Sequence, residues 1–265
     1  MSVDFAHNSM TWSERQIVAE YAASGELQPA EETILTLLRG ELADMRMLDI
    51  GVGAGRTMLH FAPAVRQYWG IDYSAAMIAA CERRRPIGAS HITLSVCDAR
   101  AMGGFPDGFF DFICFSYNGI DYVSHRDRLA IFAEVKRIGA AGALFCFSSH
   151  NLQDLRHFSF SAQWGGSLGP TAASLRAWCA LRFRHNRIFS LKKLRRLPYA
   201  AINDGVHGNR LLTYYVKPAE QLEQLAPFFE DVRAFRSSDG AMLQSLDDLR
   251  AAEDPWIYYL CRIRK

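Results

Sequence analysis

Three glycines at alternate positions form the part of the sequence best suited to chemistry. Gly51, Gly53 and Gly55 follow a mostly apolar run at residues 47–50. This order is typical of a buried strand that turns sharply into a helix, which we expect at about residues 56–65. Because glycine has no Cβ atom, the backbone can turn tightly there and approach a ligand closely. The first N–H groups of the helix would then point at that ligand.

Two classes of cofactor are bound by turns of this kind. A dinucleotide-binding fold requires G-x-G-x-x-G, in which the last small residue lets the helix pack closely on the strand. Counted from Gly51, that position holds Arg56. The spacing is instead D-x-G-x-G-x-G, opened by Asp49. A glycine-rich turn can also be a plain structural loop, so the residues after the next strands must decide between these interpretations.

Acidic residues follow the next two expected strands. The strand at 67–71 ends in Asp72, and the strand at 91–96 leads to Asp98. A carboxylate at such a position can accept hydrogen bonds from both hydroxyls of a ribose, so Asp72 indicates a nucleoside. NAD-binding folds use the same device, and Asp72 therefore does not separate the two cofactor classes.

Polar and aromatic residues follow the fourth and fifth expected strands, at 109–115 and 143–147. These residues are Asn118, Asp121, Tyr122 and His150. The carboxyl ends of parallel strands meet at one edge of a sheet, where ligands bind, so we expect these side chains near the reacting atoms. A histidine there could take a proton from an oxygen or nitrogen, since imidazole titrates near neutral pH. The alternative is that His150, and likewise His125, only makes hydrogen bonds within its loop.

In order and spacing, these motifs resemble those of the class I S-adenosylmethionine (SAM) dependent methyltransferases over residues 45–151. The D-x-G-x-G-x-G stretch is similar to the family's first motif, in which the glycines pass beneath the amino-acid end of SAM. The D-x-S-x-x-M stretch from Asp72 resembles the segment whose methionine, here Met77, lies against the adenine. Asp98 is similar to the family residue that takes the adenine amino group.

The resemblance implies a cofactor site and an acceptor site. The expected cofactor-binding residues are Asp49, Gly51, Gly53, Gly55, Arg56, Asp72, Tyr73, Met77, Asp98, Ala99 and Phe115. The residues expected to orient or deprotonate an oxygen or nitrogen acceptor are Asn118, Asp121, Tyr122 and His150. Residues 115–122 and 147–151 also resemble a subgroup of bacterial small-molecule methyltransferases. Trp12 or Tyr21, on an N-terminal helix, could touch SAM or substrate, or could simply pack.

The resemblance also implies an α/β fold: a Rossmann-like, seven-stranded sheet of order 3-2-1-4-5-7-6 with its last strand antiparallel and helices on both faces. The limits that we expect are an N-terminal helical lid at 1–44, a SAM-binding core at 45–151, a basic insertion or cap at 152–216 and a C-terminal completion of the sheet at 217–265. Further expected helices lie at 12–23, 29–42, 126–138 and 218–226, and further strands at 45–50, 210–216, 230–235 and 256–263.

The segment between Asp154 and Asp204 has no acidic residue but nine lysines and arginines. Residues 175–197 could form one or two basic helices. Three interpretations remain open. The first is a lid in which arginines such as Arg195 and Arg196 hold an anionic substrate; the second is a membrane-surface or polyanion-binding helix; the third is a solvated face or dimer contact. We prefer the lid, because insertions at strand ends overlie the site in this fold.

Composition limits the partners, metal sites and cellular locations that we expect. The net charge of +2 over 265 residues indicates neither nucleic acid nor membrane as a partner of the whole molecule. The six cysteines are scattered, which predicts no metal site and fits a reducing compartment. No signal sequence or membrane span is evident, so we expect a cytoplasmic monomer or homodimer. The rival functions are a methyltransferase of a lipid, peptide or polyanion, a non-catalytic SAM-binding protein, and an NAD oxidoreductase.

Overall fold

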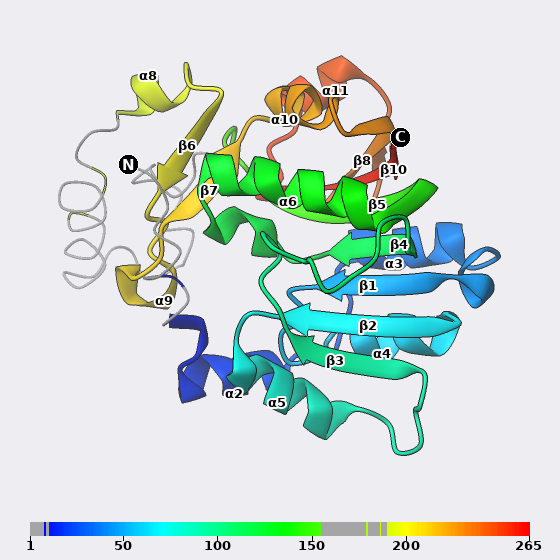
Figure 1. Ribbon diagram of the computed structural model, residues 1–265. Coiled ribbons are helices and arrows are strands. Elements are labelled where there is room, and N and C mark those ends of the chain that lie inside the picture. Colours follow the sequence, from blue (N-terminus) through cyan, green and yellow to red (C-terminus); the bar gives the residue numbers. More distant parts are fainter. Residues whose placement is uncertain (1–7, 9–10, 155–178, 180–185, 187–189) are drawn as a thin grey trace.

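The computed structural model describes Asn8, residues 11–154, Cys179, Asn186 and residues 190–265. Within this part of the chain, ten strands form one sheet (Figure 1). They are β1 (Arg46–Ile50), β2 (Gln67–Asp72), β3 (Ile92–Val96), β4 (Phe110–Phe115), β5 (Gly139–Asn151), β6 (Tyr199–Ile202), β7 (Thr213–Val216), β8 (Phe229–Arg236), β9 (Met242–Leu243) and β10 (Trp256–Ile263).

The helices lie mainly on the two faces of this sheet. The α-helices are α2 (Arg15–Ala23), α3 (Pro29–Leu38), α4 (Met58–Phe61), α5 (Ala75–Arg84), α6 (His125–Ile138), α8 (Leu191–Leu194), α9 (Val206–Asn209), α10 (Pro218–Leu225) and α11 (Leu246–Ala251). The 3₁₀ turns are η1 (Leu42–Asp44), η2 (Ala62–Ala64) and η3 (Gly119–Tyr122). Every helix in the described ranges is too short or too polar to cross a bilayer.

The predicted strand order is confirmed for the seven strands that make the core. The order is β3-β2-β1-β4-β5-β10-β8, in which β1 to β5 are parallel and β10 is antiparallel to both β5 and β8. The expected total of seven strands was too low, because β9 extends the sheet beyond β8, and β6 and β7 join it near β5.

Strand β7 joins the sheet because β5 extends past the end of β4. The expected strand covered residues 143–147, whereas β5 continues to Asn151, past the end of its neighbour β4. The backbone groups of its last residues need hydrogen-bond partners. They find them in β7, where His150 pairs with Tyr215 and Asn151 with Val216. The later part of the predicted cap is thus hydrogen-bonded to the core sheet. The domain limits that we expect at residues 44, 151 and 216 stay predictions.

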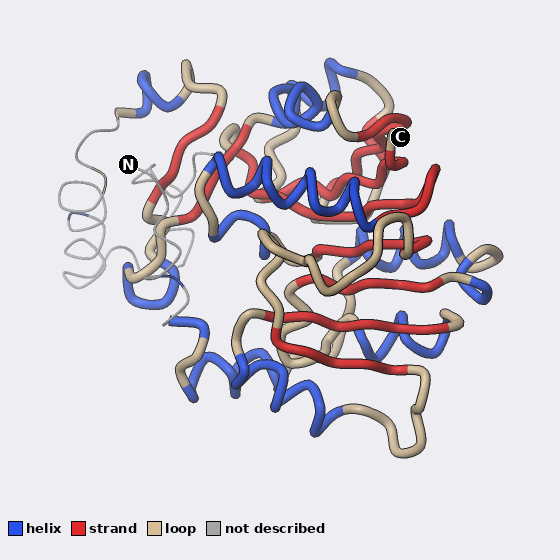
Figure 2. Tube along the Cα trace, viewed as in Figure 1, coloured by secondary structure: helices blue, strands red, loops and turns tan. Residues whose placement is uncertain are grey.

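Successive side chains of the central strands point to opposite faces of the sheet, which explains why both faces are buried. In β4, Ile113 and Phe115 pack with α6, α10 and α11, whereas Phe112 and Cys114 pack with α3, α4 and α5. Successive side chains of a strand point to opposite faces, so one strand serves two cores. Figure 2 shows the corresponding arrangement, with helices on both sides of the strands.

Some predicted helix limits were wrong. The helix expected at 56–65 is only α4, Met58–Phe61, followed by the 3₁₀ turn η2. Pro63 lies in that turn and has no N–H to continue an α-helix. The helix expected at 29–42 ends at Leu38, two residues before Gly40. Of the basic helices expected at 175–197, the structure describes α8 at Leu191–Leu194; most of that range lies outside the described residues.

Candidate functional site

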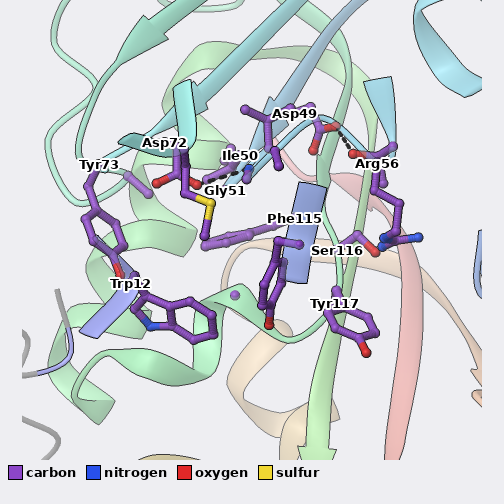
Figure 3. A pocket seen from close by; sticks show the side chains of 18 of the residues that line it. Trp12, Asp49, Ile50, Gly51, Arg56, Asp72, Tyr73, Phe115, Ser116 and Tyr117 are labelled. Atoms are coloured by element: carbon purple, nitrogen blue, oxygen red, sulfur yellow. Dashed lines mark hydrogen bonds between the residues drawn. The ribbon is translucent and has the colours of Figure 1, made fainter. Parts of the chain in front are cut away.

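A pocket lies at the carboxyl ends of the central strands and contains many of the residues that the sequence singled out (Figure 3). The expected residues that line it are Tyr21, Asp49, Gly51, Gly53, Arg56, Asp72, Tyr73, Met77, Ala99, Phe115 and Tyr122. The fold therefore gathers side chains from the N-terminal helices, the glycine turn and the loops after β2, β3 and β4. Gly55, Asp98, Asn118, Asp121 and His150 do not line the pocket.

The three glycines of the turn differ in the space around the position of a Cβ atom. All three have positive φ, between 55° and 88°. A Cβ atom on Gly51 would lie 2.8 Å from the Phe115 ring, and one on Gly55 would lie 2.7 Å from Cys81 Sγ. Gly53 differs, because the nearest atom to its Cβ would be a backbone oxygen at 3.9 Å. The space at Gly53 is therefore open to a ligand, whereas Gly55 is needed for packing against α5.

Asp49 places a carboxylate oxygen without a partner in this pocket. The side chain is buried, and its Oδ2 accepts hydrogen bonds from the Thr57 and Tyr68 hydroxyls. Its Oδ1 has no hydrogen-bond partner among the described residues. Burial raises the pKa of Asp49 to about 6, because the charged form is poorly solvated. A donor from a ligand would satisfy this oxygen, and the α-ammonium group of SAM is such a donor.

Asp72 connects the glycine turn to the end of β2. Its Oδ2 accepts from the Gly53 N–H at 3.1 Å, and its Oδ1 accepts from the Ser74 N–H at 2.8 Å. Burial raises the pKa of Asp72 to about 6. Each carboxylate oxygen retains a further acceptor site, which suits the hydroxyls of a ribose.

Tyr73, Met77, Cys97 and Ala99 continue the wall beyond Asp72 and provide apolar surface for a flat base. Cys97 was not expected in this wall. Asp98, by contrast, forms an ion pair with Arg100, with Nη2 and Oδ2 2.6 Å apart. The fit to SAM thus rests on Asp49, the open space at Gly53, Asp72 and this wall.

Arg56 is held by Glu31, a residue that the sequence did not single out. Arg56 Nη2 lies 2.7 Å from Glu31 Oε1, and Nη1 donates to Oε2. The Ser116 hydroxyl also donates to Glu31. Burial alone would raise the pKa of Glu31, but the guanidinium and this hydroxyl hold it below its usual range. Gln28 and Glu31 form a capping box at the start of α3, and a local pattern of that kind carries no signal for the ion pair with Arg56.

Aromatic rings close the side of the pocket opposite the glycine turn (Figure 3). The Trp12 ring lies 5.4 Å from that of Tyr21 and 4.8 Å from that of Tyr122, both edge to face. Tyr21 in turn lies 6.3 Å from Tyr117. Trp12 is buried, and its Nε1 has no hydrogen-bond partner in the described part of the chain. The N-terminal helices therefore contribute side chains to the pocket itself.

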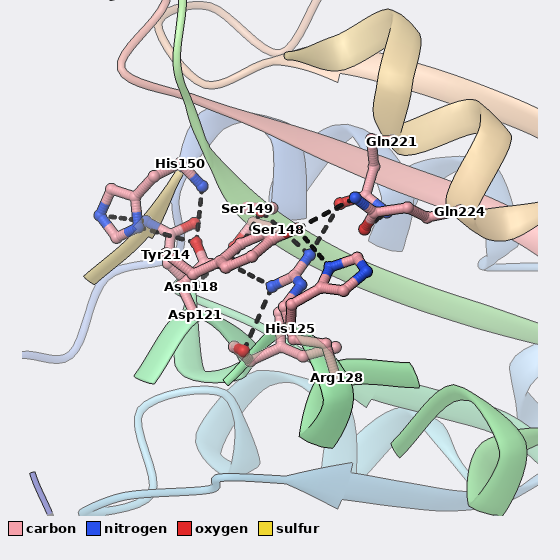
Figure 4. Close-up of polar contacts among 11 residues, drawn as sticks. Asn118, Asp121, His125, Arg128, Ser148, Ser149, His150, Tyr214, Gln221 and Gln224 are labelled. Atoms are coloured by element: carbon pink, nitrogen blue, oxygen red, sulfur yellow. Dashed lines mark hydrogen bonds and ion pairs between the residues drawn. The ribbon is translucent and has the colours of Figure 1, made fainter. Parts of the chain in front are cut away.

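A buried polar network joins Asn118 and Asp121, from the loop after β4, to α6 and the end of β5 (Figure 4). In it, the Asp121 carboxylate lies 2.7 Å from Nδ1 of the His150 ring and accepts a hydrogen bond from Arg128. The His150 side chain is 13% exposed, and Asn118 lies against its Nε2. Three of the four expected acceptor-site residues are thus brought together, next to the pocket and not on its surface. The sequence pattern carried no signal for Arg128, which looks like one charge among several on α6.

The remaining candidates lie elsewhere. Arg195 and Arg196 follow α8 and are exposed, outside the pocket lining. His125 bonds to the Tyr214 hydroxyl at 2.8 Å and stacks on Tyr199, so it belongs to the contact between α6 and the β6–β7 pair. Among the described residues, no three metal-ligating side chains are grouped as a metal would require.

Comparison with known proteins agrees with this geometry. Residues 47–142 match a family model described as a methyltransferase domain. The chain is 30% identical over 109 residues to the uncharacterized methyltransferase YcgJ of Bacillus subtilis, covering 41% of this chain and 42% of that protein. It is 30% identical over 137 residues to ajmaline N-methyltransferase of Rauvolfia serpentina, covering 50% and 46%. The chain thus matches less than half the length of either relative.

A solved structure shows the same fold. The SAM-dependent methyltransferase from Mesorhizobium loti is similar with a TM-score of 0.59 and 17% identity, over 88% of this chain and 97% of that one. The strand order, the glycine turn with its two buried acids and the family match all agree. Residues 47–142 thus match a methyltransferase domain, and the chain has the fold of the SAM-dependent methyltransferases.

Proposed function

We propose that this protein transfers a methyl group from SAM to an oxygen or nitrogen of a small molecule. The observation that carries the proposal is that two kinds of wall line one and the same pocket. One wall holds Gly53, Asp72 and the Asp49 oxygen that has no partner in the described part of the chain, and these suit the cofactor. The other holds Trp12 and Tyr122, which suit an acceptor with a flat apolar body.

SAM would supply an electrophilic methyl group. The protein's task is then to hold the acceptor atom in line with that group and to exclude water. Tyr117 and Tyr122 flank the loop after β4 and would position the acceptor, while His150, behind that loop, would receive its proton. An amine acceptor would need positioning more than deprotonation.

The charge of the pocket wall, in the described part of the chain, favours a neutral or cationic acceptor. Arg56 is the cation that lines the pocket in the described part of the chain, and Glu31 already neutralises it. An anionic acceptor, which the basic segment suggested, would have to be held by residues outside the described ranges. Ajmaline N-methyltransferase, by its name, methylates nitrogen, which supports an amine as the first acceptor class to test.

The test uses SAM labelled in its methyl group. The protein is incubated with labelled SAM and a cell extract, and the products are separated by size and polarity. Label in the small-molecule fraction supports the proposal and provides material for identifying the acceptor. Label in lipid, protein or nucleic acid contradicts it and favours the basic segment as a docking site. No transfer, with SAM binding intact, would favour a non-catalytic SAM-binding protein.

A further inference from the structure

We infer that Asp121 and Arg128 hold His150 with its hydrogen on Nδ1, so that Nε2 is the proton acceptor of the site, and that Arg128 is a positioning residue for the reaction. The catalytic part of this inference rests on the proposed function. The part that concerns the ring's hydrogen follows from the geometry of four hydrogen bonds.

The Asp121 carboxylate takes part in all four of these bonds. It is fully buried. Its Oδ1 accepts from the Arg128 guanidinium and from Ser149 Oγ at 2.8 Å. Its Oδ2 accepts from the His150 backbone N–H at 2.6 Å and faces the His150 Nδ1 at 2.7 Å. An ionised carboxylate has no hydrogen to donate, so Nδ1 must carry the hydrogen of that last contact. The lone pair of the neutral ring then lies on Nε2.

Arg128 supplies the positive charge that the buried Asp121 carboxylate requires. It comes from α6, is itself fully buried and donates to the Ile120 carbonyl at 3.2 Å and to Gln221 Oε1 at 2.7 Å (Figure 4). Its guanidinium carbon lies 4.4 Å from the centre of the Tyr214 ring. A buried carboxylate without its cation would be strongly unfavourable, so removal of Arg128 would disturb the contacts between Asp121 and the His150 ring.

The other ring nitrogen faces the loop that lines the pocket. His150 Nε2 lies 3.4 Å from Asn118 Nδ2, a long contact that a better donor can replace. Asn118 has a left-handed backbone with φ of 60°, and Oδ1 of its side chain has no partner among the described residues. Its neighbours Tyr117 and Gly119 both line the pocket. Movement of this one amide would therefore connect Nε2 to an acceptor in the pocket.

A merely structural ion pair is the competing explanation. Such a pair would join α6 to the end of β5 through Arg128, Asp121 and Ser149, and would not depend on which ring nitrogen of His150 carries hydrogen. The two explanations therefore differ in the protonation of the ring and in the pH dependence of turnover, and both can be measured.

The groups that face His150 are few in the described structure. They are Asp121 from η3, with Arg128 of α6 behind it, Tyr122 from η3 and Tyr215 from β7, whose hydroxyl donates to Asp204 at 3.2 Å. Burial raises the pKa of both phenols well above the usual value, so both stay neutral near pH 7. Trp256 of β10 also faces the ring but does not titrate. A change in pH dependence on altering Arg128 would thus be transmitted through Asp121.

The first experiment locates the hydrogen directly. Ring nitrogens of the ¹⁵N-labelled full chain are recorded by long-range ¹H–¹⁵N NMR at neutral pH, and the His150→Gln spectrum assigns the signal. We expect His150 with hydrogen on Nδ1 and an unprotonated Nε2. Hydrogen on Nε2 instead would overturn the inference. This result does not depend on methyl transfer, so it stands or fails separately from the proposed function.

The second experiment tests positioning with the labelled-SAM assay on the small-molecule fraction. His150→Gln should lower kcat by about 10²- to 10⁴-fold, the usual contribution of a general base. Arg128→Lys should lower kcat by about tenfold or more with the KM for SAM unchanged, because a single ammonium cannot replace the forked guanidinium. The acidic limb of its pH profile should move to higher pH, since a less neutralised Asp121 stabilises the protonated imidazole.

Two further variants separate positioning from folding. Arg46→Lys is the matched control, because Arg46 forms a similar two-pronged pair with Asp111, at the other end of the strands and away from the pocket. It should keep the wild-type kcat and pH profile. Ser149→Ala removes one donor to Asp121 without removing charge, and covers the case in which Arg128→Lys does not fold. If a folded Arg128→Lys or Ser149→Ala variant keeps the wild-type kcat and pH profile, Arg128 is only structural.

Discussion

Glu31 and Arg56 form a two-pronged ion pair that joins the N-terminal helices to the glycine turn. Their side chains are 2% and 13% exposed, and the Arg56 guanidinium also lies 5.1 Å from the centre of the Tyr117 ring. The Tyr258 hydroxyl adds a 3.1 Å hydrogen bond to Glu31 from β10. One carboxylate of α3 therefore connects the glycine turn, Ser116 after β4, and strand β10.

Removing this carboxylate should destabilise the protein. Glu31→Gln leaves the Arg56 charge partly buried without its partner, and we expect a loss of about 3 kcal/mol in the free energy of unfolding. The matched control is Glu32→Gln, which changes the exposed neighbour of Glu31 in the same way. Urea unfolding of both variants measures the difference. Equal midpoints would show that the pair contributes nothing to stability.

Asp49→Asn should weaken SAM binding while the protein stays folded. The amide removes the negative charge that would accept the cofactor's ammonium group. A hydrogen bond to a charged group contributes about 1.5–3 kcal/mol, so the Kd should rise by about 10- to 100-fold. Isothermal titration calorimetry gives the Kd, and Asp44→Asn, at an exposed position, serves as the control. An unchanged Kd would mean that Asp49 is not a cofactor ligand.

The raised pKa values of Asp49 and Asp72, both about 6, predict a pH dependence of stability and of SAM binding. Between about pH 4 and 6 the folded protein binds more protons at these groups than the unfolded chain. Their contribution to stability is therefore greatest at low pH and falls as pH rises through 6, by up to about 3 kcal/mol for each group. SAM should favour the ionised carboxylates, so its affinity should increase as pH rises through 6.

Proton release provides the measurement. Near pH 6, SAM binding should release protons, and the apparent binding enthalpy should then change with the ionisation enthalpy of the buffer. Asp49→Asn should release fewer protons than the wild type. Proton uptake on binding, or an affinity that falls between pH 5 and 7, would contradict this assignment of the two carboxylates.

Alanine at two glycines of the turn should have opposite principal effects. Gly55→Ala should destabilise the fold, because the new Cβ would lie 2.7 Å from Cys81 Sγ; adding Cys81→Ala should restore part of the loss. Gly53→Ala meets no atom within 3.9 Å, so its cost is the positive φ, about 1–2 kcal/mol. Its methyl group would fill cofactor space and weaken SAM binding. Thermal unfolding and SAM titration of both variants measure the two effects, and normal SAM affinity in Gly53→Ala would exclude that close approach.

Local patterns in the sequence were enough to predict most of the core. Apolar runs that end in a turn or an acid marked the strands that lead to Asp49 and Asp72, and each lies within one residue of its predicted limits. Their order in the sheet followed from the resemblance of the whole series of motifs. Glycines at alternate positions marked the turn, because positive φ restricts the residues that can stand there.

Only the tertiary structure decided which side chains share a site. Glu31 meets Arg56 across 25 residues, and Arg128 meets Gln221 across 93. No helical or strand period records such contacts, since they depend on how separate elements pack. For the same reason, the sequence could place Asp98 at a strand end, but it could not show that the side chain pairs with Arg100 and lies outside the pocket lining. A sequence period shows which face of an element is buried, whereas the packing of elements determines what that face meets.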